Sequence, residues 1–111
     1  MYEEKIKSVV AQFAEEIKGM FGNSLHNIIL YGSCARGDFT KDSDIDLMIL
    51  LDIPREEIGK ARRQITDISD KFDLDNDVVL APVIQDYQLF LQYMPASGFY
   101  QNIQKEGVVI A

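Results

Sequence analysis

Two short apolar runs, joined by a segment that contains two glycines, constrain the fold of this chain more than any other feature. The runs cover residues 25–31 and 45–51. Short runs rich in aliphatic and β-branched residues predict buried strands. Because the run at 45–51 is apolar at nearly every position, it predicts a central strand covered on both faces. Residues 32–43 are therefore expected to form a loop between two strands, with one helical turn at 33–36.

Apolar residues recur at spacings of three and four along much of the remaining chain, a pattern typical of amphipathic helices. The predicted helices cover residues 2–21, 54–71, 84–94 and 97–106. A third strand is predicted at 77–81 and should end at Pro82, which has no backbone N–H to donate. Residues 108–110 form a small edge strand or pack on the core. The alternation of helices and strands predicts an α/β fold, a sheet with helices packed against it.

Composition and charge restrict the classes of function. The 111 residues are enough for one domain, 1–111, with a real core. A net charge of −7 disfavours autonomous binding of DNA or RNA, because an acidic chain repels a phosphate backbone. No run approaches the roughly 20 apolar residues of a membrane span, and the N-terminus carries no apolar signal region. The single cysteine, Cys34, cannot form an internal disulfide, so a cytoplasmic protein is expected.

Asp44 and Asp46 stand two residues apart at the start of the second apolar run. In a strand, residues i and i+2 project from the same face, with Cα atoms roughly 6–7 Å apart. The two carboxylates can therefore converge on a hard cation such as Mg²⁺, which prefers oxygen ligands and usually keeps waters and substrate phosphates. An isolated Asp-x-Asp pair is more often a solvated strand end, so this interpretation needs support from neighbouring residues.

The residues just before this pair form a candidate phosphate-binding turn. Gly32 lets the backbone approach a ligand closely, and backbone N–H groups at the start of a helical turn favour an anion. The Ser33 hydroxyl can donate to a phosphate oxygen, although a plain tight turn is the alternative. Arg36 can reach a phosphate as a bidentate donor, or instead pair with Asp38 or Asp42 close by.

A third carboxylate can join the pair if the third strand lies beside the second. Asp77 is expected to be the first residue of that strand, because the β-branched run begins directly after it. Asp75 lies two residues earlier and would share the same face of an extended chain, so it remains the alternative.

Taken together, these motifs resemble the signature of the DNA polymerase β-like nucleotidyltransferases. The matching residues are Gly32-Ser33-x-Ala35-Arg36-Gly37 and Ser43-Asp44-Ile45-Asp46-Leu47. The order of predicted helices and strands extends the similarity over nearly the entire chain, and it is closest to the minimal nucleotidyltransferases, the smallest members of that superfamily. The resemblance implies a small mixed β-sheet flanked by helices, as in the polymerase β palm.

The resemblance also implies a reaction that uses a nucleoside triphosphate and two Mg²⁺ ions. An acceptor hydroxyl would attack the α-phosphorus in line, taking up NMP (AMP if the substrate is ATP) and releasing pyrophosphate, while the ions stabilise the attacking and leaving oxygens. The implied catalytic and metal-binding residues are Asp44, Asp46 and Asp77, and the implied phosphate-binding residues are Gly32, Ser33 and Arg36.

A protein partner is implied as well. Minimal nucleotidyltransferases are often paired with a small helical HEPN-type protein in toxin–antitoxin modules, and some members transfer AMP to a tyrosine of the toxin. An antitoxin that adenylylates its partner is therefore the leading hypothesis. Two alternatives stay open: nucleotidyl transfer to a small molecule with a partner substrate-binding subunit, and a non-enzymatic antitoxin that kept the fold. A partner or a homo-oligomer would also cover apolar side chains within 90–100, for which core packing is the other explanation.

Overall fold

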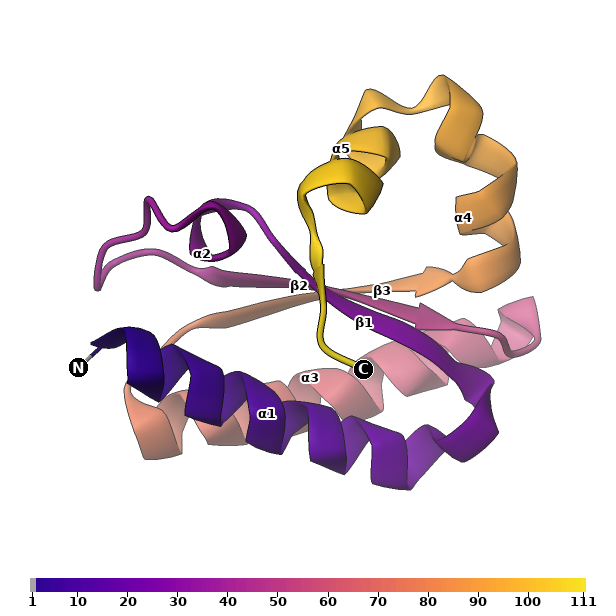
Figure 1. The fold of residues 1–111 in the computed structure, drawn as a ribbon. Coiled ribbons are helices and arrows are strands. Elements are labelled where there is room, and N and C mark those ends of the chain that lie inside the picture. Colours follow the sequence, from indigo (N-terminus) through magenta and orange to yellow (C-terminus); the bar gives the residue numbers. More distant parts are fainter. Residues whose placement is uncertain (1) are drawn as a thin grey trace.

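The computed structural model describes residues 2–111, which form a four-stranded sheet with helices on both faces (Figure 1). The helices are α1 (Tyr2–Phe21), α2 (Ser33–Arg36), α3 (Ile58–Asn76), α4 (Tyr87–Tyr93) and α5 (Gly98–Glu106). The strands are β1 (Leu25–Tyr31), β2 (Ile45–Leu51), β3 (Leu80–Asp86) and β4 (Val108–Val109). No helix in this described part of the chain is both long and apolar enough to span a membrane.

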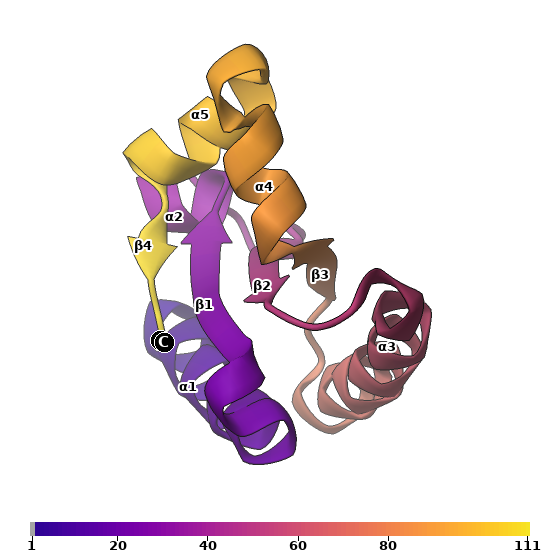
Figure 2. The same ribbon diagram turned by 90° about the vertical axis from the view of Figure 1, so that its right-hand side faces the viewer.

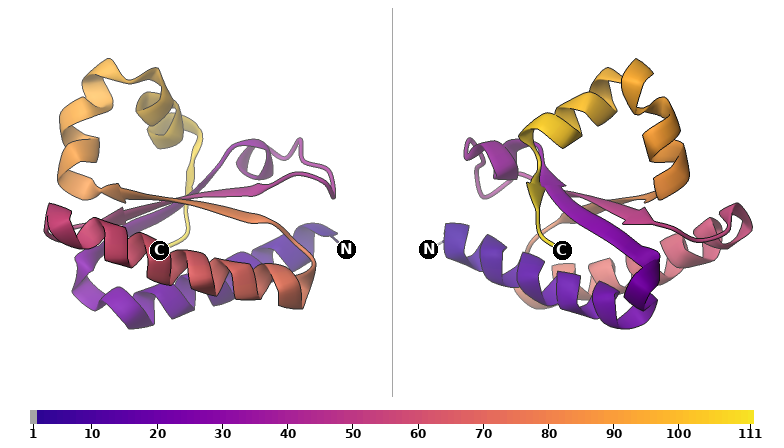
Figure 3. Two further views of the ribbon diagram at one scale, coloured as in Figure 1. Left: turned by 180° about the vertical axis from the view of Figure 1, so that it is seen from behind. Right: turned by 45° about the vertical axis from the view of Figure 1, so that its right-hand side comes forward.

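The strand order β3-β2-β1-β4 places β1 and β2 in the interior of the sheet. β2 pairs antiparallel with β1 and parallel with β3, and β4 pairs antiparallel with β1 at the opposite edge. The sheet is therefore mixed, as the family resemblance implied. Figure 2 shows α1 and α3 on one face of the sheet and α4 and α5 on the other. In the view from behind in Figure 3, α3 runs along the sheet beside α1.

β2 owes its interior position to side chains that are buried on both faces. Alternate residues over Ile45–Leu51 pack into the larger core, against apolar side chains of α1 and α3. Met48 and Leu50 face the opposite way and pack with Phe90 of α4 and Ile103 of α5 in a smaller core. The prediction of a strand covered on both faces is confirmed.

The third strand lies later in the chain than its sequence pattern predicted. β3 covers Leu80–Asp86 rather than 77–81, so Pro82 lies inside the strand, and the next helix begins at Tyr87 rather than at 84. A proline is tolerated here because β3 is an edge strand, with no partner on its outer side. The preceding helix, α3, continues to Asn76 instead of ending at 71.

For the apolar side chains within 90–100, the two explanations were core packing and cover by a partner or homo-oligomer. Phe90 is buried, whereas the side chains of Leu91, Tyr93 and Phe99 are 43%, 52% and 51% exposed. Core packing therefore accounts for only part of this cluster.

Ile49→Ala should destabilise the protein strongly, because Ile49 is fully buried in the middle of β2. Removing such a side chain leaves a cavity and lowers the free energy of unfolding by about 2–5 kcal/mol. Urea denaturation measures this quantity. Val109→Ala removes a similar side chain from a site that is 62% exposed and should change it by less than about 1 kcal/mol. Equal losses in the two variants would contradict the two-sided burial of β2.

Candidate active site

The motif residues lie at one end of the sheet, where β1 ends and β2 begins. Because these two strands are antiparallel, the last residue of β1 lies beside the first residues of β2, and Tyr31 pairs with Asp46. The connecting loop with α2 projects from this end of the sheet (Figure 1). The fold therefore brings together a turn and an acidic pair that are separated by several residues in the sequence.

Gly32 lies directly against the carboxylate of Asp46. Its φ of +73° is in the left-handed region, and a Cβ built at this position would collide with Oδ2 of Asp46. A glycine is required here for both reasons, since any side chain would strain the backbone and displace the carboxylate. The two binding features predicted from separate motifs are consequently in contact.

The turn that follows Gly32 is closed by local hydrogen bonds. The N–H groups of Ala35 and Arg36 both donate to the carbonyl of Gly32 at 3.1 Å. Cys34 Sγ donates to the carbonyl of Asp44 at 3.6 Å, which ties the turn to the start of β2. Burial raises the pKa of the Cys34 thiol and the charge of Asp46 adds to the rise, so this cysteine is a packing residue rather than a reactive thiolate. Ser33 lies at the N-terminal end of the turn, beside Gly32.

Electrostatics at the acidic pair favour a cation. Burial raises the pKa of Asp46, the neighbouring charge of Asp44 raises it further, and the guanidinium of Arg36 lowers it. Tyr31 lies in the same surroundings, and burial together with Asp46 raises the pKa of its phenol. Asp46 is partly buried and Asp44 beside it is exposed, and the repulsion between two neighbouring carboxylates is relieved when a divalent cation lies between them.

The donor set fits a hard divalent cation such as Mg²⁺, and Asp44 and Asp46 are the residues that would hold it. Within residues 2–111 no group of three or more His, Cys, Asp or Glu side chains is arranged to hold a metal ion. Water and substrate phosphates would therefore supply the remaining ligands, as is usual for Mg²⁺.

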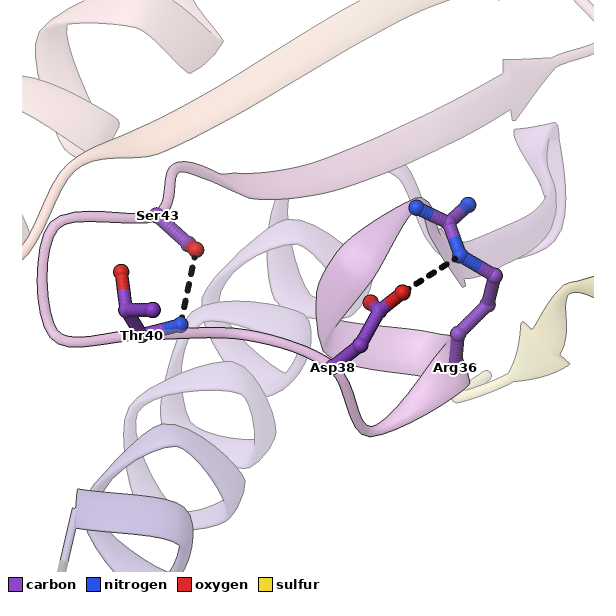
Figure 4. Close-up of polar contacts among 4 residues, drawn as sticks. All are labelled: Arg36, Asp38, Thr40 and Ser43. Atoms are coloured by element: carbon purple, nitrogen blue, oxygen red, sulfur yellow. Dashed lines mark hydrogen bonds and ion pairs between the residues drawn. The ribbon is translucent and has the colours of Figure 1, made fainter.

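Arg36 is paired within its own loop. Its Nε lies 3.4 Å from Oδ2 of Asp38 (Figure 4). A separate contact in the same loop is the hydrogen bond that the N–H of Thr40 donates to Oγ of Ser43 at 3.0 Å. Of the two acids considered for Arg36, Asp38 is the partner seen. Both side chains are about half exposed or more, and such a pair contributes little free energy. A phosphate can therefore compete for the guanidinium.

Asp77 does not start the third strand, so that prediction is wrong. It is the C-terminal cap of α3 with a left-handed φ of +53°, and β3 begins at Leu80. The helix continues past the predicted end at 71 because α3 packs against the larger core as far as Phe72. Asp77 lines a cavity of about 570 Å³ together with Lys41 and Ser43. Its alternative, Asp75, lies within α3 and is not on a strand either.

The strand position beside Asp46 is occupied by Ala81. Residues in register on neighbouring strands point to the same face of the sheet, so an acid at 81 would have been the third carboxylate of the site. A methyl group cannot bind a metal. The expectation that an acid on the third strand joins the pair is therefore not met in this register.

Asp73 is a residue whose role the sequence did not indicate. Its Oδ1 accepts a hydrogen bond from the N–H of Leu80 at 2.8 Å, so it fixes where β3 starts after α3. Burial raises the pKa of Asp73 and the hydrogen bond from Leu80 lowers it, with Asp70 and Asp44 adding smaller increases. An acceptor seven residues before its donor follows no local spacing rule, so nothing in the sequence pattern pointed to it.

Comparison with known proteins places this arrangement in a family. The family model of the nucleotidyltransferase domain matches residues 10–110. The chain belongs to this nucleotidyltransferase family. A relative from Methanocaldococcus jannaschii, named "Putative protein adenylyltransferase MJ0604", is 32% identical over 110 residues, which is 99% of each chain.

Solved nucleotidyltransferase structures share the fold. A chain described as a "putative nucleotidyltransferase from Sulfolobus solfataricus" superposes with a TM-score of 0.61 at 21% identity, covering 97% of this chain and 83% of that one. A chain from a toxin–antitoxin crystal structure with AMP-PNP superposes with a TM-score of 0.57 at 17% identity, covering 91% of this chain and 72% of that one. The nucleotidyltransferase fold implied by the resemblance is confirmed.

The contact between Gly32 and Asp46 can be tested with a double-mutant cycle. Gly32 has φ +73° and ψ −155°, a backbone region open almost only to glycine, whereas Gly37 has φ +83° and ψ 7° in the αL region, and nothing lies within 4 Å of a Cβ at position 37. Gly32→Ala should therefore lower the free energy of unfolding more than Gly37→Ala does. In an Asp46→Ala background the cost of Gly32→Ala should fall, because the collision partner is gone, while the cost of Gly37→Ala should stay the same. An equal cost of Gly32→Ala in both backgrounds would contradict the contact.

Asp46→Asn should raise the stability of the metal-free protein at neutral pH. The raised pKa means that Asp46 binds its proton more tightly in the folded protein than in the unfolded chain. Its contribution to stability is therefore present at low pH and lost as the pH rises from the ordinary value through the raised pKa. Thermal unfolding in EDTA, measured from about pH 3 to pH 8, follows this change. Asp52→Asn, at an exposed residue just after β2, is the control, and an Asp46→Asn protein less stable than wild type at neutral pH would refute the assignment.

Proposed function

We propose that this chain is a Mg²⁺-dependent protein adenylyltransferase that transfers AMP from ATP to a hydroxyl group. The observation that carries the proposal is the contact between the Gly32 turn and the Asp46 carboxylate. A triphosphate with its metal needs a phosphate-binding backbone beside a cation-binding pair, and this contact supports assigning both roles here. The name of the M. jannaschii relative, which aligns with nearly the whole chain, supports the same activity.

Each residue of the site has a specific part in this proposal. Asp44 and Asp46 hold Mg²⁺, which when bound neutralises triphosphate charge and stabilises the leaving pyrophosphate. Gly32 lets the triphosphate approach the backbone, Ser33 donates its hydroxyl hydrogen to a phosphate oxygen, and Arg36 exchanges Asp38 for a phosphate. The acceptor oxygen forms a bond to the α-phosphorus as the bond to the β-phosphate breaks. The products are the AMP ester, pyrophosphate and a proton.

The acceptor in this proposal is a tyrosine of a small helical HEPN-type partner. The net charge of −7 disfavours a nucleic-acid acceptor, and three exposed apolar side chains of α4 and α5 offer a contact surface for a protein. The toxin–antitoxin structure with AMP-PNP supports both the adenine nucleotide and the partner protein. We propose that the chain acts as the antitoxin of such a pair.

A second candidate function follows from Ala81. Since the in-register position beside Asp46 carries no acid, the chain can be an antitoxin that kept the fold and neutralises its partner by contact alone. This candidate predicts tight binding without nucleotidyl transfer.

A transfer assay separates the two candidates. The purified chain is incubated with α-labelled ATP, Mg²⁺ and a small helical HEPN-type protein, the proposed partner. For an enzyme, label should pass to the partner, and Asp44→Asn and Asp46→Asn should each lower the rate by about 10²-fold or more, because each removes a metal ligand. Asp77→Asn is the matched control and should retain most of the activity, since Asp77 lies outside the acidic pair. Complex formation without label transfer would refute the enzymatic function. Loss of activity in Asp77→Asn would show that Asp77 is the third carboxylate after all.

A further inference from the structure

A second cavity adjoins the Gly32 turn on the side of α5. It has a volume of about 260 Å³ and is lined chiefly by Tyr31, Gly32, Arg36, Phe99, Asn102 and Glu106. The cavity lies where the end of β1 faces α5, beside the loop that projects at this end of the sheet (Figure 1). Gly32 lines this cavity and also touches Asp46, so the cavity and the acidic pair share one residue.

The cavity has an aromatic wall that is held in place but not covered. The ring of Phe99 is 51% exposed, although it packs edge-on against Tyr31 at 5.8 Å and lies 5.8 Å from Tyr100. Two aromatic neighbours thus hold the ring, while about half of the residue stays exposed and Phe99 lines the cavity. A fixed, open aromatic face is a stacking surface for a planar base.

Besides Tyr31 and Arg36, the polar side chains that line the cavity are Asn102 and Glu106, both from α5. Asn102 and Glu106 are four residues apart in a helix and therefore project on the same side. An asparagine amide offers a donor and an acceptor and pairs with adenine through its ring nitrogen and its amino group. A carboxylate accepts a hydrogen bond from that same amino group. Guanine presents two acceptors on the corresponding edge, which a carboxylate does not bind.

We propose that this cavity binds the adenine base of the nucleotide, with Phe99 stacking on the base and Asn102 and Glu106 reading its edge. The inference rests on the proposed function, because it takes the triphosphate to be bound at Gly32 and Ser33. It adds the residues that select the base. Only a ribose separates the base from the α-phosphate, so the base site and the phosphate site must adjoin each other. This agrees with the position of Gly32, which borders both.

Calorimetric titration of the full chain in Mg²⁺ tests the inference with three ligands: ATP, GTP and inorganic tripolyphosphate. ATP should bind at least about ten-fold more tightly than either of the other two. Phe99→Ala should weaken ATP binding about ten-fold and leave tripolyphosphate binding unchanged. Asn102→Ala should reduce the preference for ATP over GTP. Because its side chain is exposed, this variant keeps the test independent of how well Phe99→Ala folds.

Leu91→Ala is the matched control, because it removes another exposed apolar side chain, 43% exposed on α4, that does not line the cavity. It should change the binding of no ligand. If tripolyphosphate binds as tightly as ATP, the assignment of the base site is overturned and the proposed function stands. If GTP binds more tightly than ATP, both the assignment and the choice of ATP as the donor are overturned. If none of the three ligands binds, the proposed function fails and this inference fails with it.

Discussion

The two-sided burial of β2 is the constraint on which the rest of the structure depends. This strand is hydrogen-bonded to β1 and β3 and packed on both faces, so Asp46, near its start, is its one residue that is not buried. A polar group further inside would need a buried partner. Asp44 is exposed and directly precedes the strand. The predicted site residues consequently lie at the start of a strand that is packed on both faces, and a rigid scaffold positions reactive groups best.

At the start of β2, features that suit ligand binding lower the stability of the ligand-free protein. The Asp46 carboxylate is partly buried and lies near another negative charge, and the backbone beside it is held in the left-handed region at Gly32. Both features cost folding free energy in the absence of a ligand. In the proposed function, a divalent cation with a bound triphosphate would relieve the repulsion, and the glycine would let that ligand approach. This local cost supports the proposal that the turn and the acidic pair bind a ligand.

The connection from α3 to β3 decides which side chains lie beside the acidic pair. Asp73 accepts the N–H of Leu80 and thereby sets where β3 starts, which puts Ala81 next to Asp46. A two-carboxylate pair leaves more of the metal's coordination sphere to water and substrate. In the proposed function, the nucleotide itself and the α5 residues around the neighbouring cavity would therefore have to hold the substrate in place.

The sequence by itself determined the architecture up to the second strand and indicated the residues of the proposed site. The helix at 2–21, the strands at 25–31 and 45–51 and the turn at 33–36 follow from local periodicity, and the glycine and aspartate motifs follow from spacing along one connection. The position of β3, and with it the failure of Asp77 to start that strand, was decided only in three dimensions. The acidic stretch at 73–77 has no local preference strong enough to mark where α3 ends and β3 begins. The packing of α3 on the core and the hydrogen bond from Leu80 to Asp73 decide that boundary. The same holds for the cavity under Phe99, because its walls come from segments far apart in the chain.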